Sequence, residues 1–176
     1  MKKPFTMKKL YFFFLIPFIP LFPSFSQQNL PVGFGPGEEL LIDDYLLSRS
    51  AAATGITIPP SSPVRTMAEW EEIQAIAITW TNYTSTLTPL VKFMQEQCRV
   101  IINCSDSNAV KSALTSSSVP LTNIGFIQQP FNTIWIRDYG PNSVYTNEVD
   151  SLLLVDWIYN RPRPKDDTIP NEIAKY

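Results

Sequence analysis

The sequence has 176 residues, of which 44% are hydrophobic and 17% are charged, a balance typical of one globular domain rather than of a disordered or fibrous chain. The net charge of −2 offers no basic field for binding nucleic acid, so we expect no nucleic-acid partner. Because the sequence contains no histidine, this chain alone cannot supply an imidazole as general base or metal ligand.

Residues 1–26 are predicted to be a signal peptide. Four lysines precede an apolar run of about 13 residues at positions 10–22, which is the length of the hydrophobic region of an export signal. Two serines would stand before a cleavage site at Gln27. The alternative is a membrane anchor, but the run is short for a span and contains two prolines. We therefore expect an exported protein, periplasmic or secreted, with no stable membrane span after cleavage.

Residues 27–62 are predicted to form an extended N-terminal arm or linker. Proline, glycine, serine and alanine dominate its composition, which is typical of segments without a packed core. One short apolar stretch predicts a helix of one or two turns at residues 38–47. The sequence assigns no function to this arm.

From about residue 63 the pattern alternates between strands and helices. Three strands are predicted, the first two of them buried on both faces, at residues 74–80, 99–103 and 123–127. One helix is predicted to begin at Thr88-Pro89, and a second is predicted to be capped by Ser105 or Asp106. This alternation predicts an α/β layer around a mainly parallel sheet.

The pattern changes after Pro141. Two strand-like runs at residues 142–146 and 151–157 flank a polar connection and predict a hairpin. Pro170 indicates a further helix that begins at Thr168. So short a helix is marginal in water and shows no packing partner in the sequence. We therefore expect this chain to be the N-terminal piece of a longer protein.

The two cysteines, Cys98 and Cys104, are separated by a predicted strand, whose extension holds them too far apart for a disulfide. They are expected to be two buried thiols. The alternative is that one of them is a catalytic nucleophile, but this chain has no histidine to activate it.

A carboxylate beside an indole is the first candidate binding feature. Asp138 presents two oxygens that match the paired donors of a guanidinium, and Trp135 could add a cation–π wall. The alternative is a structural Arg137–Asp138 pair or a surface turn, since Asp-Tyr-Gly-Pro is a typical turn sequence.

Two arginines separated by proline are the second candidate feature. The prolines stiffen the backbone, so Arg161 and Arg163 are pre-organised donors for a carboxylate or phosphate. Alternatively, they pair on the surface with Asp166 and Asp167. We expect this aspartate pair to be solvated or helix-capping rather than a cation site.

Three motifs stand out between about residue 63 and the end of the sequence, at residues 68–71, 132–141 and 155–167. Through these motifs the sequence resembles the bacterial, Porphyromonas-type peptidylarginine deiminase and agmatine deiminase family. The resemblance implies a pentein-type α/β propeller of the guanidino-group-modifying enzymes, with five units around a pocket. Residues 63–176 would be the N-terminal portion of the deiminase domain, so the propeller would be partial and incomplete in this chain.

The resemblance also implies roles for four residues. Asp138 would be catalytic and grip the substrate guanidinium, with Trp135 lining the pocket. Arg161 and Arg163 would hold the carboxylate of a C-terminal arginine. Because agmatine has no carboxylate, the two arginines favour peptides that end in arginine.

The implied reaction is hydrolysis of the guanidinium to citrulline and ammonia, with no cofactor or metal. The partner would be an arginine-containing peptide or a small guanidino substrate. The family's nucleophilic cysteine, histidine and second aspartate lie C-terminal to the matched region, and neither cysteine here matches the nucleophile's motif. This chain alone is therefore expected to be inactive. The alternatives are an agmatine deiminase in putrescine biosynthesis and a non-catalytic module that binds arginine peptides.

Overall fold

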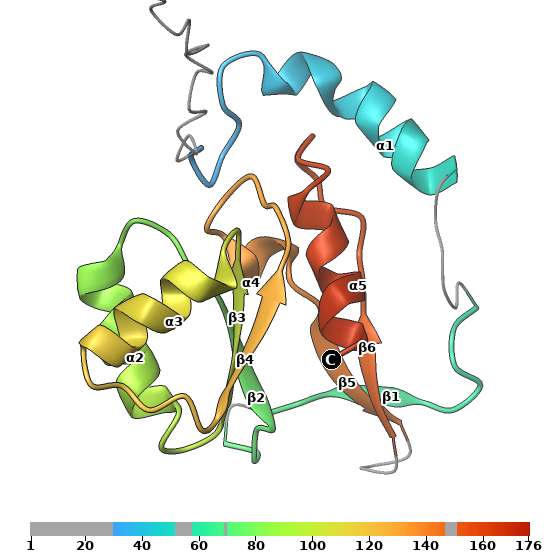
Figure 1. Ribbon diagram of the computed structural model, residues 1–176. Coiled ribbons are helices and arrows are strands. Elements are labelled where there is room, and N and C mark those ends of the chain that lie inside the picture. Colours follow the sequence, from blue (N-terminus) through green and yellow to red (C-terminus); the bar gives the residue numbers. More distant parts are fainter. Residues whose placement is uncertain (1–29, 52–57, 69, 147–150) are drawn as a thin grey trace, which may run out of the picture.

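The computed structural model describes residues 30–51, 58–68, 70–146 and 151–176. The predicted signal peptide and the hairpin connection at 147–150 lie outside these ranges. The described chain contains two three-stranded sheets, one with strand order β2-β3-β4 and one with strand order β1-β5-β6 (Figure 1).

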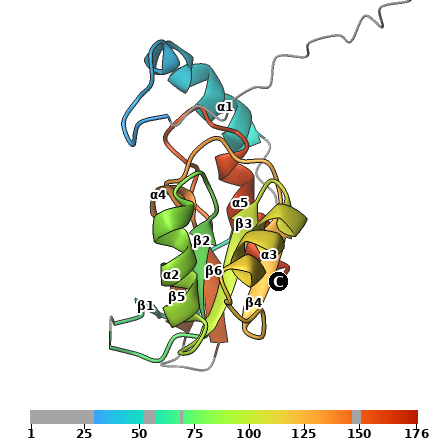
Figure 2. The same cartoon turned by 60° about the vertical axis from the view of Figure 1, so that its left-hand side comes forward.

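The first sheet is parallel and confirms the predicted α/β layer. Its strands are β2 (Ala75–Thr79), β3 (Arg99–Cys104) and β4 (Ile124–Gln128). Ala75 pairs with Arg99, and Val100 pairs with Ile124. The two connecting helices cover the same face of the sheet (Figure 2); they are α2 (Thr84–Met94) and α3 (Ser107–Ser116).

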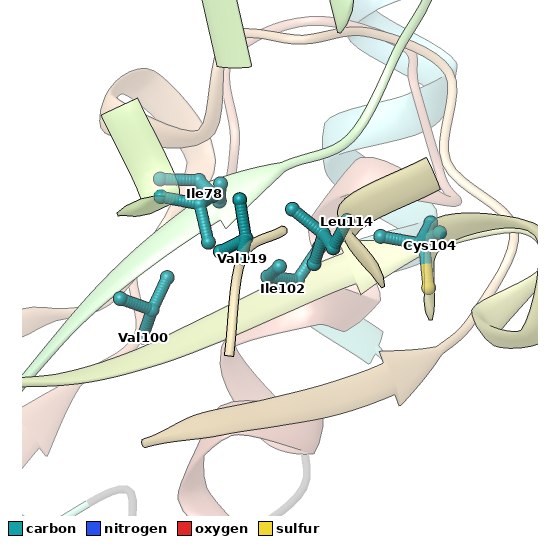
Figure 3. Packing of buried hydrophobic residues seen from close by; sticks show 8 residues of the cluster. Ile78, Val100, Ile102, Cys104, Leu114 and Val119 are labelled. Carbon is teal, nitrogen blue, oxygen red and sulfur yellow. The ribbon is translucent and has the colours of Figure 1, made fainter. Parts of the chain in front are cut away.

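The main hydrophobic core lies between this sheet and its two helices (Figure 3). Val100, Ile102 and Leu114 are completely buried there. Cys104 joins the same core, and burial raises the pKa of its thiol to about 11, so it stays protonated near neutral pH. Both cysteines are free, as predicted, but Cys98 is only half-buried.

The opposite face of the parallel sheet lines an open groove of about 1320 Å³. Ala75 and Ala77 of β2 face this groove and are half-exposed. The prediction that this strand is buried on both faces is therefore wrong for these two residues, because α2 and α3 cover the other face of the sheet (Figure 2) and this face borders the open groove.

The second sheet is antiparallel and confirms the hairpin. Its strands are β1 (Val64–Thr66), β5 (Asn142–Thr146) and β6 (Ser151–Val155). Strand β6 ends two residues earlier than the sequence predicts. Strand β1 was not predicted, because its three residues are exposed and show no apolar alternation.

Helix starts differ in detail from the predictions. Helix α2 begins at Thr84 rather than at Thr88, because the Tyr83 carbonyl already accepts the amides of Thr86 and Leu87 at 3.0 and 2.9 Å. Pro89 consequently lies inside the helix. Helix α3 is capped by Asp106, the second of the two predicted candidates.

Two further helical segments follow the hairpin, η2 (Asp166–Thr168) and α5 (Ile169–Ala174). The start of α5 after Thr168 is confirmed. The expectation that this helix has no packing partner is wrong, because Ile169 is completely buried against Tyr139 and Tyr159. The helix therefore supports the segment in which the candidate site residues lie.

The arm contains η1 (Glu38–Leu41) and α1 (Ile42–Ala51), so the predicted helix is confirmed and extends to residue 51. Across the described residues, the two sheets do not close into a propeller. None of the helices in the described ranges is long and apolar enough to cross a membrane.

Candidate functional site

The first candidate segment folds into the short helix α4 (Ile136–Tyr139). The Trp135 carbonyl accepts the amide of Asp138 at 2.8 Å, which places both residues on one turn. The Gly140 amide donates to the Ile136 carbonyl at 2.7 Å, and a β carbon on Gly140 would lie 2.4 Å from that oxygen. Only glycine therefore fits the end of this turn without displacing it.

Tyr139 attaches this turn to the parallel sheet. Its hydroxyl lies 2.7 Å from Thr79 Oγ1 at the end of β2 and donates to the Thr133 carbonyl at 3.1 Å. Its ring meets Tyr159 edge-on at 5.9 Å. Burial raises the pKa of both tyrosines, so both hydroxyls remain neutral. The α4 turn thus rests on a buried, rigid base.

Asp166 and Asp167 belong to this base. Asp166 accepts the amides of Asn132 and Thr133 at 2.6 and 3.0 Å and the Thr133 hydroxyl at 2.7 Å. Burial nevertheless raises the pKa of Asp166, with these bonds acting in the opposite direction. Asp167 accepts the Tyr159 amide at 2.9 Å and pairs with Arg49 of α1.

The predictions for this aspartate pair are therefore wrong. The two side chains are 0% and 1% exposed, so they are neither solvated nor surface partners of Arg161 and Arg163. They hold the loop before α4 and the backbone at Tyr159 in place.

The two candidate segments contact each other. Trp157 Nε1 donates to the Asp138 carbonyl at 3.2 Å, and the Asp138 charge contributes to the raised pKa of Tyr159. The Asp138 side chain is exposed. No ion pair between Arg137 and Asp138 occurs among the described side chains, so the alternative of a structural pair is not supported, and the carboxylate is accessible to a ligand.

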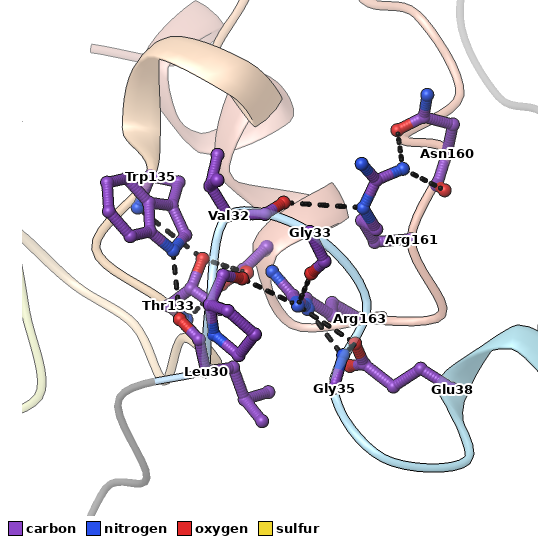
Figure 4. Close-up of polar contacts among 12 residues, drawn as sticks. Leu30, Val32, Gly33, Gly35, Glu38, Thr133, Trp135, Asn160, Arg161 and Arg163 are labelled. Atoms are coloured by element: carbon purple, nitrogen blue, oxygen red, sulfur yellow. Dashed lines mark hydrogen bonds and ion pairs between the residues drawn. The ribbon is translucent and has the colours of Figure 1, made fainter.

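Trp135 lies under the N-terminal arm. Its indole Nε1 donates to the Leu30 carbonyl at 2.9 Å, a contact across more than a hundred residues of sequence (Figure 4). The side chain is half-buried. The arm, to which the sequence assigned no function, is therefore part of the candidate site.

Arg163 is enclosed by the same arm (Figure 4). Its Nε and Nη2 donate to the two carboxylate oxygens of Glu38 at 3.0 and 2.8 Å. Nη2 also donates to the carbonyls of Pro31 and Gly33 at 2.9 and 2.7 Å. With an exposed fraction of 1%, this guanidinium is out of reach of a substrate while the arm is in place.

Arg161 is held differently. Its Nη1 donates to the carbonyl and side-chain oxygens of Asn160 at 3.0 and 2.9 Å, and its Nε donates to the Val32 carbonyl at 3.4 Å. The guanidinium stacks on the Phe34 ring at 4.3 Å. The side chain remains half-exposed, so it is the more accessible of the two arginines.

Sequence reasoning missed Glu38, the arm residue that matters most to the site. The sequence analysis placed Glu38 only at the start of a short helix, and no local pattern shows that this residue will dock against a segment 125 residues away. Among the residues that the structure describes, no group of three or more histidine, cysteine, aspartate or glutamate side chains is placed to hold a metal ion.

Comparison with known proteins identifies a matching protein family and several similar structures. The sequence profile of the Porphyromonas-type peptidyl-arginine deiminases matches residues 65–175. Among solved structures, a Porphyromonas gingivalis protein assigned as an arginine deiminase is 17% identical with a TM-score of 0.54, and the match covers 64% of this chain and 37% of that chain.

Two structures of agmatine deiminase from C. jejuni are also similar. A cysteine-to-serine variant with substrate bound is 15% identical with a TM-score of 0.53, covering 69% of this chain and 39% of that chain. The second is 17% identical with a TM-score of 0.51, covering 68% and 39%. At these identities the likeness establishes a shared α/β fold, and this chain spans less than two-fifths of each solved chain.

Proposed function

The chain belongs to the Porphyromonas-type peptidyl-arginine deiminase family, and we propose that the whole protein hydrolyses the guanidinium group of a C-terminal arginine to citrulline and ammonia. The observation that carries this proposal is the contact between the two candidate segments. One segment presents the exposed carboxylate of Asp138, and the other presents the half-exposed guanidinium of Arg161. A C-terminal arginine has the complementary charges, a guanidinium and a free carboxylate.

Asp138 is the proposed partner of the substrate guanidinium, which its two oxygens can accept side by side. Trp135, on the same turn, is the proposed pocket wall. Arg161 is the proposed partner of the substrate carboxylate. Arg163 shares that role in our sequence-based prediction, but its Nε and Nη2 donate to Glu38 and the arm and its side chain is 1% exposed, so direct contact would require the arm to move.

The bond-breaking groups are proposed to lie outside this chain. A cysteine thiolate would attack the guanidinium carbon, and ammonia would leave. Water would then release the product as citrulline, with a histidine moving the protons. This sequence has no histidine, and the Cys104 thiol is held protonated by burial. We therefore propose that residues 27–176 alone release neither ammonia nor citrulline. Turnover by this chain that is lost in Cys98→Ala would contradict that.

Agmatine is the second candidate substrate. It is a cation without a carboxylate, and one observation favours it: Glu38 already neutralises Arg163, which leaves a single accessible arginine rather than two. An agmatine deiminase would need Asp138 and no carboxylate partner.

The test uses the whole protein and three substrates: a peptide ending in arginine, the same peptide with its terminal carboxylate amidated, and agmatine. Citrulline formation from the free acid, at least tenfold faster than from the amide, supports the proposal. Equal rates on the free-acid peptide and its amide would contradict a contact with the substrate carboxylate. Turnover of agmatine alone would support agmatine as the substrate.

Export is proposed separately. The lysines at the start and the apolar run at residues 10–22 support it. A shortened mature protein that starts near Gln27, recovered outside the cytoplasm, is the expected result, and an uncleaved protein in the cytoplasm would contradict it.

A further inference from the structure

The arm is shaped to present Glu38 to Arg163. The Gly35 amide donates to Glu38 Oε2 at 2.6 Å, and the Glu38 amide donates to the Gly35 carbonyl at 3.1 Å. Gly37 between them has a φ of 81°, a left-handed conformation that favours glycine. The loop's own hydrogen bonds therefore hold the Glu38 carboxylate in the orientation in which it contacts Arg163.

Arg163 is in turn enclosed by arm atoms. Both oxygens of Glu38 and two backbone carbonyls of the arm accept its hydrogen bonds. The pairing with Arg163 lowers the pKa of Glu38, so the glutamate is charged at neutral pH. Releasing this arm would break all four of these hydrogen bonds and the ion pair with Glu38 at once. These contacts fit a permanent attachment of the arm.

The attached arm shapes the surroundings of Arg161. Phe34 lies in the sequence between Gly33 and Glu38, which both contact Arg163, and it stacks on the guanidinium of Arg161. The Val32 carbonyl accepts a hydrogen bond from Arg161 Nε. Together with Asn160, these contacts restrict the orientation of a side chain that would otherwise have many rotamers.

We propose that Arg163 is a positioning residue: through Glu38 it fastens residues 30–38 over the site, and this arm orients Arg161 as the guanidinium that binds the substrate carboxylate. The inference rests on the proposed function for the identity of the ligand. It assigns Arg163 a different role from direct substrate binding, and it makes the arm a specificity-determining wall of the site.

The competing arrangement is a strap that excludes the substrate, in which the Glu38 carboxylate takes the place of the substrate's carboxylate on Arg163. The two arrangements predict opposite effects of loosening the arm. A wall that is lost weakens the binding of a carboxylate substrate, whereas a competitor that is lost strengthens it.

The experiment compares Glu38→Gln with Glu39→Gln in the whole protein. Glu39 is the matched control, because it is the next residue, carries the same charge and is exposed. Hydrogen–deuterium exchange of residues 30–38 measures the attachment of the arm. Steady-state kinetics with a peptide ending in arginine and with its amide measure the consequence for the site.

We expect residues 30–38 to exchange at least tenfold faster in Glu38→Gln and to be unchanged in Glu39→Gln. In the same variant, KM for the free-acid peptide should rise about tenfold while kcat and the amide kinetics stay the same. Phe34→Leu should raise KM for the free acid without releasing the arm, which provides a second test should Glu38→Gln fold poorly.

Unchanged exchange in Glu38→Gln, or equal effects of both glutamine variants, would overturn the attachment through Arg163. Faster exchange of residues 30–38 together with a lower KM for the free-acid peptide would show that the arm competes with the substrate. Faster exchange with an unchanged KM would show that the arm has no role in substrate binding. If the wild-type protein turns over no arginine peptide, the proposed function fails, and the exchange comparison still decides whether Arg163 fastens the arm.

Discussion

Single charged residues around the site divide into exposed and buried ones. Asp138 is exposed and Arg161 is half-exposed, whereas Arg163 and Asp166 are at most 1% exposed. A buried charge is costly unless it is paired and hydrogen-bonded. Arg163 has Glu38 as its partner, and Asp166 accepts three hydrogen bonds. The buried charges therefore hold the frame together, and the exposed ones remain for a ligand.

Asp138→Asn tests the proposed guanidinium contact. The amide keeps the size of the side chain but loses the charge and one acceptor, which costs about 3 kcal/mol of transition-state binding, or roughly a 100-fold loss of kcat/KM. The measurement is citrulline formation by the whole protein. Asp44→Asn, on the exposed first turn of α1, is the control and should retain full activity. A decrease in kcat/KM of less than threefold in Asp138→Asn would contradict a contact between this residue and the substrate guanidinium.

The attachment of the arm should depend on pH. Because Arg163 lowers the pKa of Glu38 below its ordinary value of 4.5, the contact stabilises the docked arm fully above that value and is lost as the pH falls through the lowered pKa. Exchange of residues 30–38, compared with that of β3, should therefore accelerate only in acid. Glu38→Gln should abolish this dependence, and exchange of the arm relative to β3 that does not change as the wild-type protein is acidified would contradict it.

Residue types alone predicted part of this picture. An aspartate beside an indole and two arginines between prolines were predicted to be binding features because their chemistry can be read from the sequence, and their binding roles stay a prediction. The difference between Arg161 and Arg163 was not readable, since both stand in the same Arg-Pro context. Only the docking of Glu38 distinguishes them, and that depends on tertiary structure.

Among the elements, the α4 turn holds the site most directly. It places Trp135 and Asp138 within one turn and ends where Gly140 approaches the Ile136 carbonyl. Its attachment to β2 through Tyr139 and Thr79 connects it to the rigid parallel sheet. The position of Asp138 therefore depends on the close approach of the Gly140 backbone to the Ile136 carbonyl.

Gly140→Ala tests this dependence. The new β carbon would lie 2.4 Å from the Ile136 oxygen, so the turn must open, at a cost of about 2 kcal/mol in the free energy of unfolding. Gly33→Ala is the control, because a β carbon there meets nothing within 4 Å. Urea denaturation of this chain measures both. Equal stability of the two variants would show that the close approach at Gly140 is relieved without cost.

The strands of the parallel sheet could be predicted because each is a run of apolar residues of strand length. The start of α2 could not, because a Thr-Pro pair is a common helix start and the true first turn is made of polar residues that carry no apolar pattern. Strand β1 was missed because it is exposed, and its place is determined by pairing with β5 across 78 to 82 residues of sequence.

At the scale of the whole molecule, the arm and the site form one structure. Among the described residues, six arm residues contact the two candidate segments: Leu30, Pro31, Val32, Gly33, Phe34 and Glu38. In addition, Arg49 of α1 pairs with the buried Asp167. Composition predicted a linker, because proline and glycine are typical of linkers. The same residues here form the tight turns that direct the arm across the site.

The most direct test of the account is the interaction between Arg161 and the substrate carboxylate, measured as a cycle in the whole protein. Wild type and Arg161→Gln are each assayed with a peptide ending in arginine and with its amide. We predict that Arg161→Gln lowers kcat/KM for the free acid roughly 30-fold, corresponding to about 2 kcal/mol, and leaves the amide unchanged. An equal loss on acid and amide would contradict the account, because Arg161 would then not bind the carboxylate.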